Sequence, residues 1–322
     1  MRSFFARKAF SVRSVTIVVL AALSMGAAGP TGPTKHVVGY TSISFARAPV
    51  WIAGDLRIYE KNGINAETVF LRGGIVGTQA LISGSASFLA SSGSSAVEAI
   101  LSGADLVILA GYSNLLDQIL VTKREMKSAA QLKGARVALN SLAGGSLLAV
   151  RITLSALGLD PDRDVTYIAL GDPASRLTAL KAGIVDATVL TTPFNSIAKK
   201  AGFNVFDDIP ALKNIDYPAD SIIASGDFVA REPALAERMI KSIGEAVQFY
   251  RSNKTRSLAI VTKYLRGVSP EDLEDAYVRY LSGFRDKPVP SIKGIQTVLQ
   301  WSKHPKAKTA DPTRFVPRQS VK

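Results

Sequence analysis

Short β-rich runs alternate with amphipathic segments along most of the chain, and this order constrains the fold more than any other feature. Alternation of this kind is typical of α/β proteins, in which helices connect parallel strands and cover the sheet. We therefore expect an α/β fold with mixed, mainly parallel sheets flanked by helices. The strand-like runs are residues 37–41, 66–71, 86–90, 105–110, 136–140, 165–170 and 185–191.

Turn and cap residues mark where helices begin and end between these runs. Pro49 can open the first helix because a proline at the first helical position loses no hydrogen bond, and Gly63 can end it. The run Ser95-Ala96-Val97-Glu98 has the spacing of a capping box. Asp172 and Pro173 are typical of an N-cap and a first helical residue. Farther along, strand-like runs at 205–209 and 221–224 precede a mainly helical region from about 233 to 303.

The alternation occurs twice, and the two passages align at a shift of 99 residues. Residues 80–84, Ala-Leu-Ile-Ser-Gly, fall on residues 179–183, Ala-Leu-Lys-Ala-Gly. The strand-like run 37–41 falls on 136–140. Few residues are identical, so the passages share an architecture more than a sequence. Two similar α/β units in one chain predict two lobes that face each other.

Residues 1–28 have the composition of an export signal, with a basic start, an apolar stretch at 15–25 and small residues at 26–28. The apolar stretch is shorter than the roughly 20 residues that span a bilayer, which favours a cleaved signal over a membrane anchor. The leader has neither a twin-arginine pair nor a lipoprotein cysteine, so we expect general secretion into a periplasm. Its basic residues are Arg2, Arg7, Lys8 and Arg13.

Charge and residue counts exclude several kinds of function. The formal net charge is +13, and the leader carries four positive and no acidic side chains, which leaves +9. The Lys and Arg residues are scattered and do not alternate with aromatic residues, so we expect no nucleic-acid partner. The chain has no cysteine, which excludes disulfides, thiol catalysis and thiolate metal sites. His36 and His304 lie at the start of the mature chain and in a lysine-rich tail, so we expect no catalytic residue, metal or cofactor.

Small and hydroxylated residues follow nearly every predicted strand. Open parallel sheets bind ligands at the carboxyl ends of their strands, where loops lead into helix N-termini with unpaired N–H groups. Such loops let the backbone approach a ligand and supply hydrogen bonds, which suits oxyanions and polar head groups. The predicted ligand-binding residues are Thr41, Ser42, Ser44, Phe45, Arg72, Gly73, Gly74, Ser91, Ser92, Gly93, Ser94, Tyr112, Asn140, Ser141, Gly144, Gly145, Ser146, Asp172, Thr191 and Thr192.

Each of these residues also has a purely structural interpretation. A serine or threonine at such a position can simply cap a helix, although the pattern at strand ends of both units favours a shared cleft. Arg72 could pair with an acidic group of the ligand or form a structural salt bridge. Phe45 and Tyr112 could stack on a ring or close the core. Arg176 and Asp172 could pair within one helix turn.

Ten short stretches occur in an order and spacing that one family shares. They are Ala48-Pro49-Val50-Trp51-Ile52-Ala53, Tyr59-Glu60-Lys61-Asn62-Gly63-Ile64, Arg72-Gly73-Gly74, Gly103-Ala104-Asp105-Leu106-Val107, Leu132-Lys133-Gly134, Leu157-Gly158-Leu159, Leu180-Lys181-Ala182-Gly183, Val185-Asp186-Ala187, Pro193-Phe194 and Gly294-Ile295-Gln296-Thr297-Val298-Leu299. Over nearly its whole mature length, the chain resembles the ABC-transporter substrate-binding proteins for nitrate, sulfonate, taurine and thiamine-precursor pyrimidines. These are type II periplasmic binding proteins.

The resemblance implies two lobes joined by two hinge crossings, which fit residues 118–123 and 218–224. It also implies that the strand-end loops hold a ligand between the lobes, which close because some contacts form only in the closed state. Relatives often carry an acidic residue before the Pro-Phe pair, and Thr192 at that position makes a basic ligand less expected. The implied segments are lobe I at 36–120 and 220–305, lobe II at 121–219, and a loosely ordered tail at 306–322.

The expected function is capture of a small polar or anionic molecule by a monomeric protein and its delivery to an ABC permease in the cytoplasmic membrane. The ligand could be a sulfonate, nitrate, a carboxylate or a pyrimidine-like molecule. A solute-sensing module that presents its closed form to a receptor needs the same clamp, so the sequence does not separate the two. A pyrimidine-synthesising enzyme of the same fold is a further alternative. Against it, the chain has no Gly-x-Ser-x-Gly motif, no histidine near a candidate serine and no Cys/His/carboxylate cluster.

Overall fold

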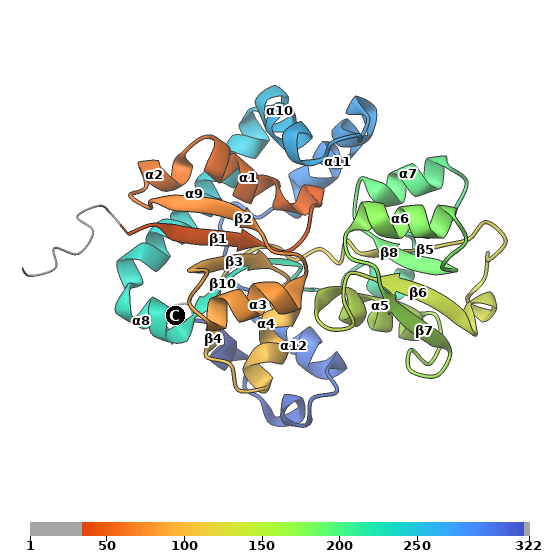
Figure 1. The fold of residues 1–322 in the computed structure, drawn as a ribbon. Helices are drawn as coiled ribbons and strands as arrows, with labels where there is room; N and C mark the ends of the chain where they lie inside the picture. The colour runs from red at the N-terminus through yellow and green to blue at the C-terminus, as the bar shows by residue number, and fades with distance from the viewer. Residues whose placement is uncertain (1–33, 319–322) are drawn as a thin grey trace, which may run out of the picture. The chain divides into compact units, whose positions relative to one another are not determined.

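Ten strands form two separate five-stranded sheets in the computed structural model, which describes residues 34–318 (Figure 1). The first sheet has the order β2-β1-β3-β10-β4 and the second β7-β6-β8-β5-β9. The strands of the first sheet are β1 (His36–Tyr40), β2 (Ala66–Phe70), β3 (Phe88–Ser91), β4 (Leu106–Ser113) and β10 (Asp220–Ser225). Those of the second are β5 (Ile119–Thr122), β6 (Ala135–Leu139), β7 (Val165–Ala169), β8 (Ala187–Leu190) and β9 (Asn204–Phe206).

Helices flank both sheets, and we call each sheet with its helices a lobe. The first lobe has α1 (Ala48–Asp55), α2 (Ile58–Lys61), α3 (Gly74–Ile82), α4 (Gly93–Leu101), α8 (Gly226–Arg231), α9 (Pro233–Ser252), α10 (Lys254–Tyr264), α11 (Pro270–Gly283) and α12 (Ile292–Trp301). The second has α5 (Gly145–Ala156), α6 (Pro173–Lys181) and α7 (Phe194–Lys200). Short 3₁₀ helices are η1 (Phe45–Arg47), η2 (Ala129–Leu132), η3 (Pro210–Leu212), η4 (Pro305–Thr309) and η5 (Pro312–Phe315). The predicted α/β fold is therefore confirmed.

The two lobes repeat the same parallel framework at the shift of 99 residues that the sequence predicts. In the first sheet, Val38 of β1 pairs with Phe88 of β3. In the second, Val137 of β6 pairs with Ala187 of β8, and both residues lie 99 positions farther along. Helices α3 and α6 are related by the same shift. The two units thus share the hydrogen-bond register between their strands, although few of their residues are identical.

Each sheet is completed by one antiparallel strand that enters from the other lobe. Strand β10 follows the second lobe in the chain but pairs with β3 of the first, with Ser221 opposite Ser91. Strand β5 follows β4 but pairs with β8, with Ile119 opposite Leu190. The chain therefore crosses between the sheets at 114–118 and at 207–219. The predicted crossings, 118–123 and 218–224, lie mostly inside β5 and β10. These segments have strand-like sequences because they pair within the sheets.

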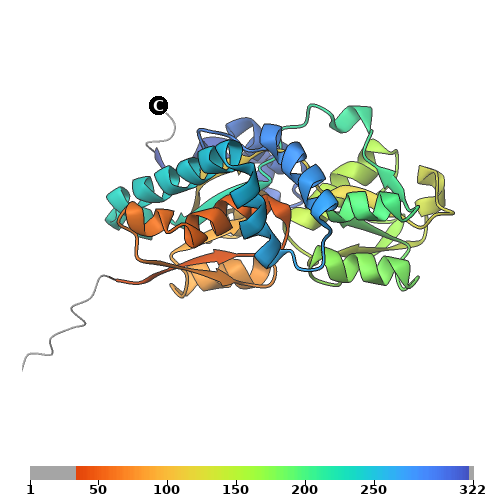
Figure 2. The same cartoon turned by 90° about the horizontal axis from the view of Figure 1, so that it is seen from above.

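The first sheet is buried on both faces because its strands send alternate side chains to opposite sides. Phe88 and Ala90 of β3 pack in the same cluster as Trp51 of α1 and Ile243 of α9. Figure 2 shows α9 running beside α1, above the sheet. On the opposite face, Leu89 shares a cluster with residues of α3, α4 and α12, namely Leu81, Val97 and Ile295. This packing fixes the strand ends from which the polar loops leave.

Three predicted details are corrected. The predicted capping box at Ser95 is wrong, because α4 begins at Gly93 after Ser92 and Ser95 already lies in its first turn. The predicted helix from Pro49 to Gly63 is interrupted at Arg57, whose φ of 54° is left-handed and ends the helical geometry. The tail from 306 is not loose where it is described, because Phe315 is buried in the first lobe's core.

Two predictions concern the ends of the chain. The predicted signal peptide, residues 1–28, lies outside the described residues. Residues 319–322 of the predicted tail also lie outside them. Among residues 34–318, no helix is both long enough and apolar enough to cross a lipid bilayer.

Candidate ligand-binding site

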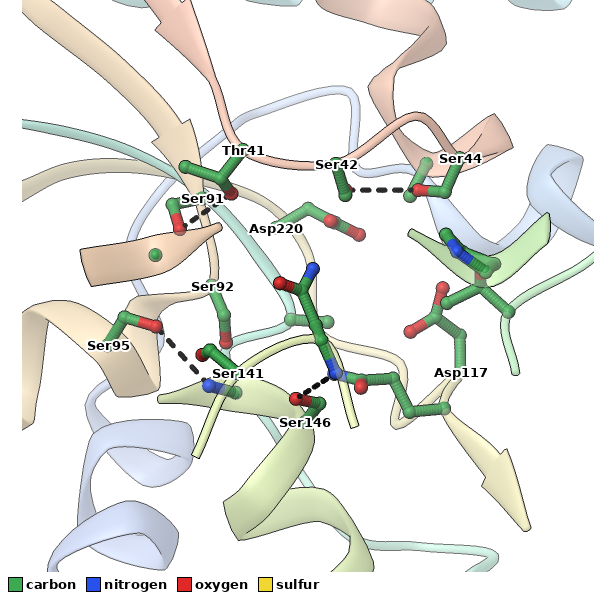
Figure 3. A pocket seen from close by; sticks show the side chains of 18 of the residues that line it. Thr41, Ser42, Ser44, Ser91, Ser92, Ser95, Asp117, Ser141, Ser146 and Asp220 are labelled. Atoms are coloured by element: carbon green, nitrogen blue, oxygen red, sulfur yellow. Dashed lines mark hydrogen bonds between the residues drawn. The ribbon is translucent and has the colours of Figure 1, made fainter. Parts of the chain in front are cut away.

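A polar cavity of about 60 Å³ lies where strand-end loops of both lobes meet (Figure 3). Thr41 follows β1 and Ser91 ends β3, while Asn140 follows β6 and Thr191 follows β8. These strands are equivalent in the repeat, so both lobes contribute the same kind of strand end, as expected for open parallel sheets. The predicted residues that line the cavity are Thr41, Ser42, Ser44, Gly74, Ser91, Ser92, Asn140, Ser141, Gly145, Ser146 and Thr191.

Several predicted residues support the cavity wall without lining it. The Tyr112 hydroxyl accepts a hydrogen bond from Arg47, and Phe45 is stacked on Tyr280 at 5.6 Å between ring centres. The Ser94 hydroxyl bonds with that of Tyr217 at 2.9 Å. These three side chains are buried, so the structural interpretation fits them. Gly93 lies directly beneath Pro218, where a Cβ atom would come within 2.8 Å of the proline side chain.

Other predicted residues lie at the line where the two lobes approach each other. A Cβ atom on Gly144 would lie 2.5 Å from Ser95 Oγ, and one on Gly73 would lie 3.2 Å from Asn140 Oδ1. Arg72 is exposed and lies beside the backbone of Gly171, outside the cavity.

Two predicted residues of the second lobe stay outside the cavity. The carboxylate of Asp172 caps α6, where it accepts hydrogen bonds from the backbone N–H and the hydroxyl of Ser175, both at 2.9 Å. It therefore forms no ion pair with Arg176, although the sequence allows one. Thr192 is buried next to Thr191 but does not line the cavity.

The cavity also contains charged residues that the sequence reasoning did not select. They are Arg47, Asp117, Arg176 and Asp220, each at most 5% exposed. Further lining residues are Ala46, Ser95, Gln118, Ala143, Pro173 and Ala219. The sequence holds a signal for one of them, because Arg47 is a single charge within the apolar run from Phe45 to Ala53. A charge that cannot reach solvent usually has a partner or a function.

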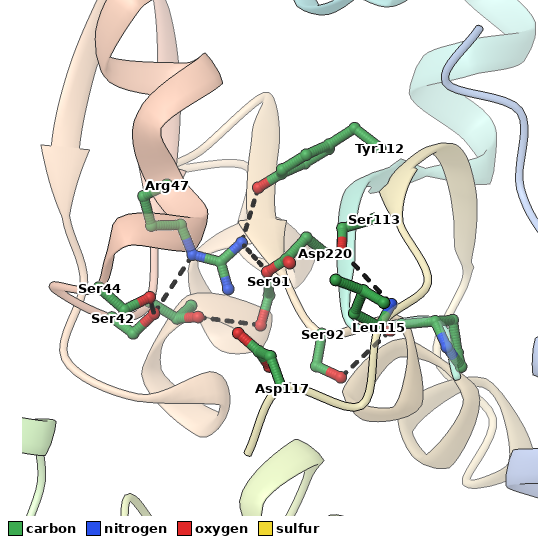
Figure 4. A network of polar contacts seen from close by, with 12 residues as sticks. Ser42, Ser44, Arg47, Ser91, Ser92, Tyr112, Ser113, Leu115, Asp117 and Asp220 are labelled. Atoms are coloured by element: carbon green, nitrogen blue, oxygen red, sulfur yellow. Dashed lines mark hydrogen bonds and ion pairs between the residues drawn. The ribbon is translucent and has the colours of Figure 1, made fainter. Parts of the chain in front are cut away.

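Arg47 is held by one carboxylate and two hydroxyl groups of the first lobe (Figure 4). Its Nη1 donates to the Tyr112 hydroxyl at 2.7 Å and lies 2.9 Å from Asp220 Oδ1. Its Nε donates to Ser42 Oγ at 3.2 Å. Burial would lower the pKa of Arg47, but Tyr112 and Asp220 outweigh burial and raise it. Arg47 is therefore a paired structural cation at the cavity wall.

The two aspartates of the cavity lie at the same end as Arg47. Burial raises the pKa of Asp220 to about 7, with Arg47 opposing this shift and Asp117 adding to it. Burial likewise raises the pKa of Asp117, although its carboxylate accepts a hydrogen bond from the Tyr280 hydroxyl. One arginine and two carboxyl groups thus line this end of the cavity, and Arg279 lies near enough to Asp117 to oppose the rise of its pKa.

Arg176 comes from the first turns of α6 in the second lobe and is 2% exposed. Its Nη1 donates to the carbonyl oxygen of Gly171 at 2.6 Å. It forms no ion pair with any residue of the described chain, 34–318, and its Nε has no hydrogen-bond partner there. Burial lowers the pKa of Arg176 to about 10, and the nearby Asp172 opposes this only in part. Arg176 is thus a buried cation without a compensating anion.

Comparison with solved structures identifies the class of fold. A protein of Bordetella bronchiseptica superposes with a TM-score of 0.79 at 20% identity, over 90% of this chain and 96% of that one. The alkanesulfonate-binding protein of Xanthomonas axonopodis pv. citri, bound to MOPS, gives 0.68 at 18% identity, over 90% and 96%. The periplasmic nitrate-binding protein of Synechocystis PCC 6803 gives 0.68 at 16% identity, over 89% and 87%. The chain therefore has the type II periplasmic-binding-protein fold.

Comparison with protein families gives the narrower assignment. Residues 29–262 match the model of the NMT1-like family, and the chain belongs to this family. A protein of Brucella abortus (strain 2308), provisionally named a binding protein, is 28% identical over 234 residues, 71% of each chain. The resemblance that the sequence motifs indicate is thereby confirmed.

Proposed function

We propose that the protein is an extracytoplasmic solute-binding protein, which captures a small polar or anionic molecule between its lobes and delivers it to an ABC importer. The family and the fold support this proposal, and two of the similar structures are proteins that bind alkanesulfonates and nitrate. The proposed ligand-binding residues are the strand-end residues that line the cavity, together with Arg176 and Asp220. We propose a periplasmic location after cleavage of the leader, and a monomeric state.

The uncompensated charge of Arg176 is the observation that carries this proposal. Removing a guanidinium from water costs several kcal/mol unless an anion and hydrogen bonds replace the lost hydration. Arg47, in the same cavity, has an acid and two hydroxyls as partners, whereas Arg176 has one carbonyl. An anionic ligand in the cavity would supply what Arg176 lacks.

Contacts between the lobes explain how a captured ligand could be retained. The N–H of Gly145 in the second lobe donates to Ser95 Oγ of the first at 3.3 Å. The hydroxyl of Tyr217, in the crossing segment 207–219, donates to the carbonyl oxygen of Gly145 at 2.9 Å. At another edge, Lys200 Nζ of α7 lies 2.8 Å from Asp272 of α11. Contacts of this kind would be made only by closed lobes and would couple closure to binding.

A thermal-shift screen of the mature protein with small sulfonates, carboxylates and nitrate tests the proposal. A ligand that binds only the folded state raises the melting temperature. We expect Arg176→Met to lower the affinity for an anionic ligand by at least about thirtyfold, because truncating one partner of a buried charge pair costs about 2–5 kcal/mol. Arg163→Met is the matched control, since Arg163 is an exposed arginine of the same lobe. Equal loss in both variants would contradict the proposed role of Arg176.

The same clamp could instead present its closed form to a receptor, as a sensing module does. Transport and sensing are separated by reconstituting the protein with its permease and measuring ligand uptake. Uptake that requires this protein supports delivery, whereas ligand binding without any uptake favours sensing. We propose no enzymatic activity for this site.

A further inference from the structure

Tyr217 lies in the second crossing between the lobes, and it contacts both of them. Its backbone N–H donates to the carbonyl oxygen of Asn114, in the other crossing, at 3.2 Å. Its side chain is 0% exposed and belongs to one apolar cluster with Val97 of α4 in the first lobe and Leu148 of α5 in the second. The ring is therefore fixed at the hinge, outside the ligand cavity.

We propose that Tyr217 is a positioning residue for ligand capture. Its hydroxyl group links the cavity serines of the first lobe to the first residue of α5 in the second, and this link stabilises the closed state. The inference rests on the proposed function and deepens it, because it assigns a role in closure to a residue that does not line the cavity.

The N-terminus of α5 meets the N-terminus of α4 beside Tyr217. A Cβ atom on Gly145 would lie 2.7 Å from Ser92 Cβ, so a glycine is needed for the two helix ends to approach so closely. The N–H of Gly145 donates to Ser95 Oγ at 3.3 Å, a bond drawn in Figure 3. The carbonyl oxygen of Gly145 accepts from the Tyr217 hydroxyl at 2.9 Å. Both polar groups of this backbone residue are thus bonded to groups outside the second lobe.

Three hydroxyl groups form a chain that runs from the cavity to Gly145. Tyr217 Oη lies 2.9 Å from Ser94 Oγ, which lies 2.8 Å from Ser92 Oγ. A carbonyl oxygen can only accept, so the single proton of the Tyr217 hydroxyl is donated to Gly145. Tyr217 must then accept from Ser94, and Ser94 must accept from Ser92. One acceptor in the second lobe therefore fixes the direction of every bond in the chain.

The chain connects the docking of α5 with the wall of the cavity. Ser92 lines the cavity, and its hydroxyl is the first donor of the chain. A longer contact of 3.3 Å joins the same hydroxyl to the carbonyl oxygen of Pro218, the residue after Tyr217. When the lobes part, Tyr217 loses the carbonyl of Gly145 and the direction of the chain is no longer fixed. Closed lobes thus orient the Ser92 hydroxyl, and hydrogen bonds in such chains strengthen one another.

Tyr217→Phe tests the role of the hydroxyl, because phenylalanine keeps the ring and its packing. Tyr250→Phe is the matched control, since Tyr250 is also 0% exposed and donates to one backbone carbonyl, that of Tyr277 in the same lobe. The probes are nitrate, ethanesulfonate and propanoate. Calorimetric titration measures the affinity for the tightest of the three, and stopped-flow displacement measures its release rate.

We expect Tyr217→Phe to weaken binding of that probe by about fivefold, since one hydrogen bond contributes about this much net. The loss should come mainly from faster release, because the bond is made only by closed lobes. Tyr250→Phe should change affinity by less than about twofold. A buried hydroxyl with a merely structural role would not alter the release rate.

Ser94→Ala interrupts the same chain and leaves the tyrosine in place. It should weaken binding of the same probe by about threefold. In the double variant with Tyr217→Phe, the loss should be smaller than the product of the two single losses, because the hydroxyls act as a unit. Unchanged affinity in Ser94→Ala, or a double-variant loss equal to the product, would overturn the hydroxyl chain.

The outcomes separate this inference from the proposed function. If the unmodified protein binds a probe and Tyr217→Phe releases it no faster than Tyr250→Phe does, the role of Tyr217 is overturned while ligand capture stands. If the unmodified protein binds none of the three probes, both are overturned. If Tyr217→Phe does not fold, the affinity of Ser94→Ala decides.

Discussion

Two buried arginines line the same cavity, one from each lobe, and their surroundings differ in nearly every respect. Arg47 in the first lobe contacts a carboxylate and two hydroxyls. Burial would lower the pKa of Arg47, but Tyr112 and Asp220 outweigh burial and raise it. Arg176 in the second lobe has a single carbonyl partner, and burial lowers its pKa to about 10. The difference teaches that burial of a charge says little about its role. A buried charge that the protein itself pairs has a structural role, whereas one left without a partner is a candidate for binding a ligand.

The largest expected effect concerns stability and comes from the satisfied arginine. Arg47→Met should lower the free energy of unfolding by about 3–5 kcal/mol, because it leaves Asp220 buried without its partner. Arg176→Met should leave the free energy of unfolding unchanged or slightly increased, because it removes an unpaired buried charge. Urea unfolding followed by circular dichroism measures both. Similar losses in the two variants would break the comparison.

A smaller effect should follow from crowding the contact between the lobes. A Cβ atom on Gly145 would lie 2.7 Å from Ser92 Cβ, which is closer than such atoms pack. Gly145→Ala should therefore hinder closure and lower ligand affinity by about tenfold, as expected for overpacking by about 1–3 kcal/mol. Isothermal titration with the tightest-binding ligand of the thermal-shift screen measures the change. Unaltered affinity would show that ligand binding does not need the contact of Gly145 with Ser92.

A pH dependence of ligand affinity, of similar or smaller size, should arise from Asp220 at the first-lobe end of the cavity. Burial raises the pKa of Asp220 to about 7, so below pH 7 this carboxyl gains a proton and stops acting as a pure acceptor. Affinity for an anion that donates a hydrogen bond to Asp220, such as β-alanine, should then fall by about tenfold between pH 8 and pH 6, while affinity for propanoate, which has no such donor, changes less. The charged and titratable groups near Asp220 are Arg47, Asp117, Tyr112, Tyr217 and Tyr280, and the Ser113 side chain bonds to its carboxyl group. Titrations at both pH values check this, and equal dependence for the two probes would contradict it.

The smallest expected effect concerns the arginine that the sequence alone selects. Arg72 follows a strand directly, but it is exposed and lies outside the cavity. Arg72→Met should change ligand affinity by no more than about twofold, because exposed charges are screened by water and salt. Titration of this variant beside Arg176→Met sharpens the comparison. A larger loss from Arg72→Met than from Arg176→Met would reverse the assignment.

The sequence predicts the framework of the cavity well, because the framework depends on periodic patterns. Runs of β-branched residues, glycine at helix ends and the shift of 99 residues identify the strands and their equivalence. Open parallel sheets bind ligands at the carboxyl ends of their strands, so the polar residues at those ends are expected near a ligand site. Thr41 and Asn140 are two such residues, and both line the cavity.

The charged part of the site is not predictable in this way, because pairing is a property of three-dimensional contacts. Arg47 and Asp220 lie far apart in the chain and meet only because β10 returns to the first sheet. The N-cap pattern at Asp172 predicts its hydrogen bond with the Ser175 N–H, but nothing in the sequence indicates that Arg176 then has no other acid as a partner. The sequence pattern therefore predicts where the polar loops lie, whereas the three-dimensional structure is needed to tell which buried charges have partners.

A crystal structure of the mature protein with the tightest-binding ligand of the thermal-shift screen tests the central claim most directly. We predict that the anionic group lies within about 3 Å of the Arg176 guanidinium, the normal range for a charge-assisted hydrogen bond. A probe bound away from Arg176, or one whose anionic group contacts Arg47 instead, would contradict the account.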